Sequence, residues 1–215
     1  MQLIWNPQDA AAWQDLHARQ RGSLQQAWAY GQALQSLGVE IHRAEIRDGQ
    51  RLLGLAQFQC RRLAFYIGLA SCSRGPVWAE GTTPEEQRQA LRLLKKGIPT
   101  RPWRATVFSP EVAAGDAVHQ ALGGLHRVMT GYSTVMLDLR RSQADLRAAL
   151  DGKWRNRLVR AEAQQGLQMH VRASGKDVQW LLERENLQRE SRGFHALPTA
   201  FVQAYIDSQD RKSVV

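Results

Sequence analysis

Apolar and polar residues follow two different periods along this chain, and the changes between them outline its elements. Residues 1–5 have the composition of a short strand. Asn6 followed by Pro7 predicts the start of a helix, because an amide side chain and then proline suit the first positions of a helix. Loose helical spacing of the apolar residues extends this helix to about Gln20.

A second helix and a hairpin are predicted next. Ser23 suits the N-cap of a helix whose apolar residues recur at helical spacing, and Gly38 suits its end. The segment 39–46 is typical of a strand, with one slip in its alternation. An Asp-Gly turn at 48–49 and one or two strands within 51–68 complete an antiparallel hairpin.

The middle of the chain mixes helices and strands. Thr82 or Thr83 is the expected cap of a helix over 84–98, with acidic residues in its first turn and lysines in its last. A strand over 104–110, a short helix over 116–125 and a long strand over 126–139 follow. This order predicts a mixed α/β fold with an antiparallel start.

The pattern changes at Ser142, which suits the N-cap of a helix broken or kinked near Gly152. A strand over 167–174 and two helices over 175–194 and 197–206 follow. Because a strand and two helices also open the chain, we interpret this part as a second copy of one unit that stops early.

Charge narrows the classes of partner. The chain has 29 basic and 20 acidic residues, a net charge of +9, which favours phosphate-bearing partners: nucleic acid, nucleotide-linked substrates or an anionic membrane face. No apolar run approaches the ~18 residues of a membrane span. We therefore expect a cytoplasmic protein with at most peripheral contact with the inner membrane face. Its two cysteines stand apart, and no metal site is expected.

Four segments follow one another over about residues 20 to 205 and read SLQQAWAYGQALQSLG, SRGPVW, KWRNRLVRAEAQQGLQMHV and ERENLQRESRGFHALPTAFVQAY. In this order they resemble the Fem-type peptidoglycan-bridge aminoacyltransferases of the GNAT superfamily. The resemblance implies two GNAT-like units in tandem, each a mixed sheet with flanking helices. It also implies transfer of an amino acid from aminoacyl-tRNA, or of a related acyl group, to an amine of a peptidoglycan precursor.

The resemblance also suggests a domain division and a truncation. We expect a first GNAT-like domain over 1–140, a basic helical linker over 141–166 and an incomplete second GNAT-like domain over 167–209. Residues 210–215 have the sequence of a translated sequencing adapter and are expected to be a non-native tail. A fragment of this kind is expected to be inactive alone.

The first candidate site is basic. Lys153, Arg155, Arg157 and Arg160 lie within eight residues, and guanidinium groups bind phosphate bidentately, which suits a pyrophosphate-linked precursor or a tRNA backbone. On a helix, residues 153, 157 and 160 share one face and Arg155 points elsewhere. A solvated linker face is the alternative. Arg74, held by the turn at Gly-Pro, is the second candidate, with a plain structural turn as the alternative.

Weaker candidates are aromatic or lie near the end of the chain. Trp28 and Tyr30 suit a substrate cleft or, alternatively, the core. Arg192 and His195 lie at the junction of the last two helices, and His195 has the right ordinary pKa to accept a proton from an attacking amine. No nucleophile–base motif is visible, so the catalytic residues stay unknown. Direct attack of an amine on an activated ester needs mainly positioning.

Two other functions stay open. One is a GNAT-type N-acyltransferase that uses acyl-CoA on another amine, in a polysaccharide or lipid pathway. No loop for the coenzyme pyrophosphate is found, because the segment from Arg19 to Leu24 fails at its last position, and so no cofactor is expected. The other is a basic RNA-binding module.

Overall fold

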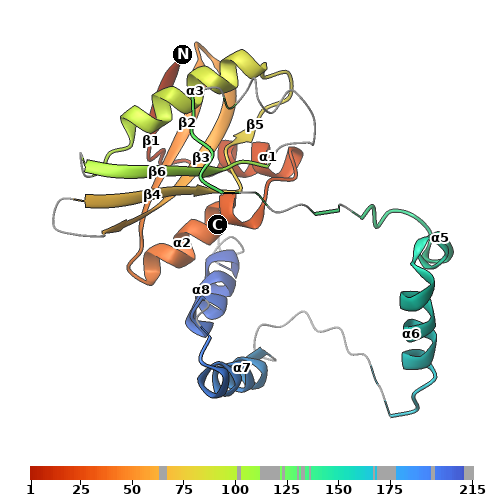
Figure 1. Cartoon of the computed structure of the whole chain (residues 1–215). Coiled ribbons are helices and arrows are strands. Elements are labelled where there is room, and N and C mark those ends of the chain that lie inside the picture. Colours follow the sequence, from red (N-terminus) through yellow and green to blue (C-terminus); the bar gives the residue numbers. More distant parts are fainter. Residues whose placement is uncertain are drawn as a thin grey trace. The chain divides into compact units, whose positions relative to one another are not determined.

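The computed structural model describes residues 1–62, 67–100, 103–111, 122, 124–129, 131, 134–135, 137–166, 168, 178–194 and 197–210. The elements found within them, shown in Figure 1, are β1 (Gln2–Trp5), α1 (Ala11–Arg19), the 3-10 turn η1 (Leu24–Gln26), α2 (Trp28–Ser36), β2 (Glu40–Asp48), β3 (Arg51–Arg62), β4 (Ile67–Ser73), β5 (Val77–Trp78), α3 (Pro84–Gly97), β6 (Trp103–Ser109), α5 (Gln143–Ala149), α6 (Gly152–Glu162), α7 (Gln179–Arg192) and α8 (Thr199–Asp210).

One mixed sheet organises the first part of the chain. Its strands lie in the order β1-β2-β3-β4-β6, and the short β5 pairs with β3. All pairs are antiparallel except β4 with β6, which run parallel from the pair Ile67–Trp103 to the pair Ser73–Ser109. The expected mixed α/β class with an antiparallel start is therefore confirmed, and the parallel pair brings the carboxyl ends of β4 and β6 together.

Helix α3 covers one face of this sheet (Figure 1). From Ala56 to Cys60, alternate side chains of β3 face it, and Phe58 is fully buried there. The face is apolar throughout: the buried cluster consists of Ala44, Ile46, Leu53, Ala56, Phe58, Cys60, Ala70, Cys72, Ala90, Leu91, Leu94 and Ile98. Burial of this cluster supplies the main apolar contribution to folding.

The opposite face is covered in part by α1 and α2. Trp13 and Leu16 of α1 pack on Leu55. Helix α2 packs on β2 and on α8, where the rings of Tyr30 and Phe201 meet edge to face with 4.9 Å between their centroids. Beyond these contacts β3 continues with polar side chains, so this face changes from apolar to polar along the strand.

The chain divides into two units. One contains residues 1–128 and 181–215, and the other residues 129–180. In the second unit, α5 and α6 carry no buried residue, and Arg147 of α5 pairs with Glu162 of α6. Among the residues that the structure describes, no helix is both long enough and apolar enough to cross a membrane.

Several predicted element boundaries are confirmed where a local signal specifies them. The turn at 48–49 joins β2 to β3, with Gly49 at a φ of 55°. Thr83 caps α3, and it forms a reciprocal capping box with Glu86. The helix predicted after Ser142 is broken in two, and Asp151 caps the second part by accepting a hydrogen bond from the Lys153 backbone N–H at 2.9 Å.

Two predicted helix starts are wrong, because tertiary contacts use the capping side chains. Helix α1 begins at Ala11 and not after Asn6. Asn6 instead extends the β1–β2 ladder, with its side-chain oxygen accepting the Arg43 backbone N–H at 3.0 Å. Ser23 makes no capping bond, and its hydroxyl donates to the Arg74 carbonyl at 3.0 Å.

The later predictions have mixed outcomes. In the described part of 126–139 no strand forms, and Val135, Leu137 and Leu139 are exposed. The strand predicted over 167–174 falls outside the described residues except for Gln168. The domain boundaries at 140 and 166, and the foreign tail, stay predictions. Helix α8 packs on α2 within the first unit, a contact that no local pattern indicates.

Candidate functional site

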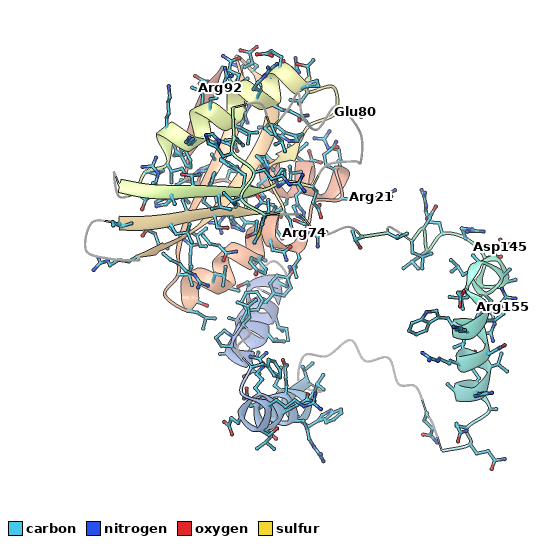
Figure 2. All side chains as sticks on the ribbon, in the orientation of Figure 1. Arg21, Arg74, Glu80, Arg92, Asp145 and Arg155 are labelled. Carbon is cyan, nitrogen blue, oxygen red and sulfur yellow. The ribbon has the colours of Figure 1, made fainter. Side chains whose placement is uncertain are left out.

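A polar site lies where the two parallel strands of the sheet end. β4 ends at Ser73 and β6 at Ser109, which are paired, and Arg74 and Glu111 follow them closely. Ligands of open α/β sheets bind outside the carboxyl ends of parallel strands, because loops diverge there and leave backbone and side-chain groups exposed. Figure 2 labels Arg74 at this end of the sheet.

A small hollow of about 260 Å³ runs along the sheet face opposite α3 and leads to this end. Its lining residues are Gln59 and Arg61 of β3 and Leu69, Ser71 and Ser73 of β4. The hydroxyls of Ser71 and Ser73 lie 3.3 Å apart. Arg61 is exposed and forms no ion pair within the described residues. The hollow therefore offers hydroxyl and amide groups and a free guanidinium to a polar ligand.

The backbone of Arg74 is fixed by hydrogen bonds, whereas its side chain is half-exposed. Its φ is 53°, its carbonyl accepts the Ser23 hydroxyl, and its N–H donates to the Ser109 hydroxyl at 3.3 Å. The Arg74 side chain is 48% exposed, and its guanidinium pairs with Glu111, whose side chain is 44% exposed, through an Nε–Oε1 contact of 2.5 Å. Arg74 therefore projects a half-exposed cation from a fixed backbone.

Gln26 stabilises this region, because its side chain takes the place of backbone hydrogen bonds that β3 and β4 do not form with each other here. The strands pair at Gln59–Ser71, but no pair is formed between Gln57 and Ser73. There the fully buried Gln26 amide accepts the Gln57 N–H at 2.8 Å and donates to the carbonyls of Gln57 at 3.2 Å and Ser73 at 2.8 Å. A side chain at Gly75 would collide with Gln26, so glycine is required there.

Arg43 is buried, unlike Arg74, and its role is structural. It is 7% exposed and donates to the side-chain oxygens of Gln57 at 2.7 Å and Gln35 at 3.3 Å and to the Trp28 carbonyl at 3.1 Å. Burial lowers the pKa of its guanidinium to about 10. A side chain at Gly31 would lie 2.4 Å from Arg43, so α2 sits directly on this arginine and leaves no room for a ligand.

The two predicted cleft aromatics lie in this packed layer. The Trp28 ring stacks under the Arg43 guanidinium at 4.1 Å and meets Trp13 edge to face. Tyr30 is 5% exposed, and burial raises the pKa of its hydroxyl, an effect that a hydrogen bond with Gln59 opposes. Tyr30 thus contacts Gln59, which lines the hollow, but Tyr30 itself does not line it.

The predicted basic segment forms α6 in the second unit. Arg155 does not project freely, because its guanidinium donates to the carbonyls of Ala148 and Leu150 at 2.9 Å each and so caps the end of α5. Lys153, Arg157 and Arg160 are exposed and share one helix face. Beside this face the Trp154 ring is 64% exposed and stacks under Arg157 at 5.6 Å.

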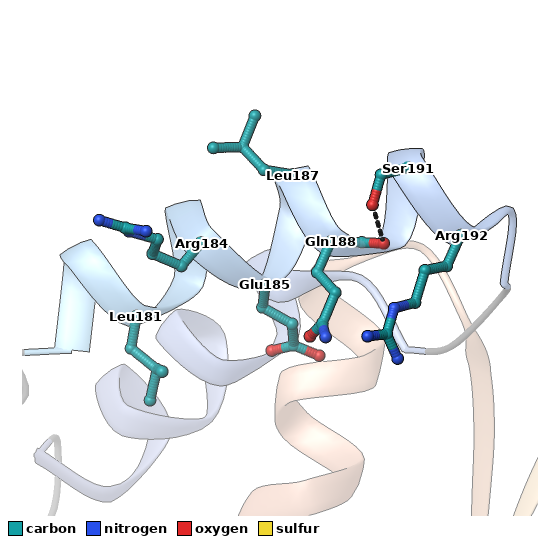
Figure 3. A pocket seen from close by; sticks show the side chains of 7 residues that line it. All are labelled: Leu181, Arg184, Glu185, Leu187, Gln188, Ser191 and Arg192. Carbon is teal, nitrogen blue, oxygen red and sulfur yellow. Dashed lines mark hydrogen bonds between the residues drawn. The ribbon is translucent and has the colours of Figure 1, made fainter.

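The last two predicted site residues lie at the end of α7. His195 lies outside the described residues. Arg192 borders an open hollow shown in Figure 3, whose other lining residues are Leu181, Arg184, Glu185, Leu187, Gln188 and Ser191. All seven belong to one helix, so no second element presents groups across the hollow. This arrangement favours the sheet end over α7 as a binding site.

One cluster has the composition of a metal site. Ligand atoms of Glu40, His42 and Cys60 lie within 4.8 Å of one another. The side-chain oxygen of Asn6 already accepts the Arg43 backbone N–H, so its side-chain nitrogen donates to His42 Nδ1 at 3.2 Å. The His42 proton then lies on Nε2 and faces Glu40 Oε1 at 2.9 Å. A metal needs that nitrogen unprotonated, so the geometry favours a hydrogen-bonded cluster.

The cysteines are buried and unreactive in character. Burial raises the pKa of Cys60 to about 11, with a smaller contribution from Glu40, and burial also raises the pKa of Cys72. A thiol with a raised pKa carries little thiolate at neutral pH and is a poor nucleophile. Both cysteines therefore act as small apolar residues of the core.

Sequence reasoning identified Arg74 but missed its neighbours. Glu111, Arg61 and the two serines of β4 were not singled out, although a signal existed. The chain places SRGP and SPE directly at the ends of two strands. Only the parallel pairing of β4 with β6 brings these ends together.

Comparison with protein-family models gave no match, and comparison with curated protein sequences gave none either. Among solved structures, a crystal structure of FemX matches with a TM-score of 0.72 and 16% sequence identity. The match covers 97% of this chain and 55% of the FemX chain, so this chain spans about half the length of FemX. The fold expected from the resemblance to Fem-type transferases is confirmed: over nearly all of its length, this chain has the fold of FemX.

Proposed function

We propose that this chain is part of a Fem-type transferase, which moves an amino acid or acyl group from an activated carrier such as aminoacyl-tRNA to an amine of a peptidoglycan precursor. The observation that carries the proposal is the match to FemX over 97% of the chain. The four ordered sequence segments that resemble Fem-type transferases support it independently.

Two of those segments meet in the fold, which supports a shared purpose. The segment SLQQAWAYG contributes Gln26, and SRGPVW contributes Ser73 and Gly75. Gln26 donates to the Ser73 carbonyl, and Gly75 leaves the space that Gln26 fills. Together they fix the backbone from which Arg74 projects, so two of the four segments that carry the resemblance contribute to the candidate site.

The charge distribution supports a phosphate-bearing substrate. Three cations lie on one face of α6, those of Lys153, Arg157 and Arg160, and Arg61 adds a cation at the hollow of the sheet. Phosphate groups bind such cations with a strong dependence on salt. Amine attack on an ester asks the protein mainly to position its substrates and stabilise the developing oxyanion, so we assign no catalytic residue.

Binding of a phosphate-bearing precursor is the first test. Arg157→Gln with Arg160→Gln is expected to weaken binding of a nucleotide-linked muropeptide about tenfold and to reduce its dependence on salt. The control is Arg140→Gln with Arg141→Gln, which removes the same charge from the same unit outside α6. Equal weakening by both double variants would contradict a specific surface on α6.

Transfer is the second test, made with this chain and with the complete reading frame should it extend further. Radiolabelled aminoacyl-tRNA and acyl-CoA are supplied in parallel with the precursor. Label on the precursor from aminoacyl-tRNA supports the proposal, and label from acyl-CoA alone supports the N-acyltransferase alternative. Steep salt-dependent RNA binding with no transfer from either donor would favour an RNA-binding module.

A further inference from the structure

We propose that Arg74 anchors a carboxylate of the ligand and that Glu111 is a built-in competitor that occupies this anchor until the ligand displaces it. The inference builds on the proposed role of Arg74 in ligand binding, but it concerns how that site is held closed and needs no transfer reaction. It rests on the contacts that Arg74 and Glu111 make at the ends of β4 and β6.

The position is one that binds ligands in other sheets. Arg74 and Glu111 follow the only parallel strand pair in the described sheet, beyond the paired residues Ser73 and Ser109. The hollow lined by Ser71 and Ser73 leads to the same end. A ligand lying along β4 would therefore bring one of its ends to Arg74.

The Arg74–Glu111 contact has the right chemistry for the anchor but an incomplete geometry. Arg74 donates to Glu111 through both Nε and a terminal nitrogen, and both contacts fall on the same oxygen, Oε1. A carboxylate free to approach in the plane of the guanidinium accepts two parallel bonds on its two oxygens. A ligand carboxylate can thus form the paired contact that Glu111 does not form.

Displacement of Glu111 is easy because the pair is open to water. Both side chains are about half exposed, and ion pairs of this kind contribute little to stability. The Arg74 backbone does not depend on Glu111, because Ser23 and Ser109 hold its carbonyl and N–H. Release of Glu111 therefore frees the cation without disturbing its position.

The test uses the whole chain and an acetylated dipeptide with a free terminal carboxylate, followed by NMR titration. Glu111→Gln is expected to tighten binding about threefold to fivefold, which is what a half-exposed ion pair contributes. Arg74→Gln is expected to abolish binding. The control Glu85→Gln removes the same charge from an exposed pair with Arg88 on α3 and should leave the affinity unchanged.

The outcomes separate the proposal from its rivals. Unchanged or weaker binding by Glu111→Gln, or equal tightening by Glu85→Gln, would overturn the role of Glu111. Equal binding of the dipeptide carboxamide, or stronger binding of inorganic pyrophosphate at Arg74, would overturn the assignment of a carboxylate. Because none of these measurements requires acyl transfer, a failed transfer assay leaves the result standing, and a failed titration leaves the transferase proposal standing.

Discussion

The two faces of the sheet contrast sharply, and β3 contributes to both. Ala56, Phe58 and Cys60 point toward α3 into a layer that excludes water. Between them, Gln57 and Gln59 point to the opposite face, where coverage by helices ends and the polar hollow begins. Successive side chains of a strand point to opposite faces, so one strand can seal a core and line a site at once.

The contrast indicates which substitutions should change the stability of the fold and which should change ligand binding. On the sealed face a change in side-chain volume affects packing, because interiors are close-packed. On the open face the polar side chains contact solvent or bond to one another, so we expect substitutions there to change ligand affinity more than the stability of the fold. Gln26 and Gln57 lie between these cases, because they are polar and fully enclosed.

The largest effect is expected on the sealed face. Phe58→Ala should lower the free energy of unfolding by about 3–5 kcal/mol, because it leaves a cavity between the sheet and α3 and removes ring contacts with Trp5 and Phe108. Chemical denaturation measures the change. Arg61→Ala on the open face of the same strand should change it by less than about 0.5 kcal/mol. A similar loss for both variants would remove the distinction between the faces.

A smaller loss is expected at the boundary between the faces. Gln26→Leu keeps the volume but leaves the Gln57 N–H and the carbonyls of Gln57 and Ser73 without their partner, at a cost of about 1–3 kcal/mol. Denaturation monitored by hydrogen exchange at Gln57 reports it. Gln59→Leu on β3, two residues from Gln57, is the control, and an equal loss there would show that Gln26 has no special role.

The smallest effect concerns the cap of the helix that seals the core. Thr83→Ala should destabilise the protein by about 1 kcal/mol, because the first turn of α3 loses its side-chain cap. The hydrogen bond from the Thr83 N–H lowers the pKa of Glu86, so the contribution of this carboxylate is present at neutral pH and is lost as pH falls through that lowered pKa.

The pH profile provides a check on this cap. Glu86→Gln should flatten the loss of stability toward acid pH, measured as the denaturation midpoint against pH. Its neighbour Glu85, which lies in the same first turn but outside the capping box, is the control. An identical profile for Glu85→Gln would mean that general charge on the helix, and not the cap, sets the acid sensitivity.

Local signals predicted the elements that depend on neighbouring residues. The Asp-Gly turn, the capping box of α3 and the break between α5 and α6 each depend on side chains within four positions of the backbone they affect. The strand predicted over 126–139 had the right alternation, yet its described residues form no strand. Alternation indicates that a segment can form a strand, but a strand exists only where another strand pairs with it.

The candidate site was predicted only in part, for the same reason. Arg74 was named from its turn, and Lys153, Arg157 and Arg160 from their shared helix face. The partner of Arg74 lies 37 positions away, and the atoms that hold Arg155 belong to the end of another helix. No pattern within a short window reports which distant group an arginine will meet.

The sequence by itself determined the mixed α/β class, most of the helices and strands, and the positive charge. Each of these depends on periodicity, caps and composition, which act over a few residues. Only the tertiary structure decided that Asn6 bonds to β2 and Ser23 to Arg74, where the sequence predicts helix caps. It also decided that Arg74 pairs with Glu111. These contacts arise because the pairing of β4 with β6 and the packing of α2 on β2 bring together hydrogen-bonding groups that are distant in the sequence. Once such groups are buried, they need hydrogen-bond partners.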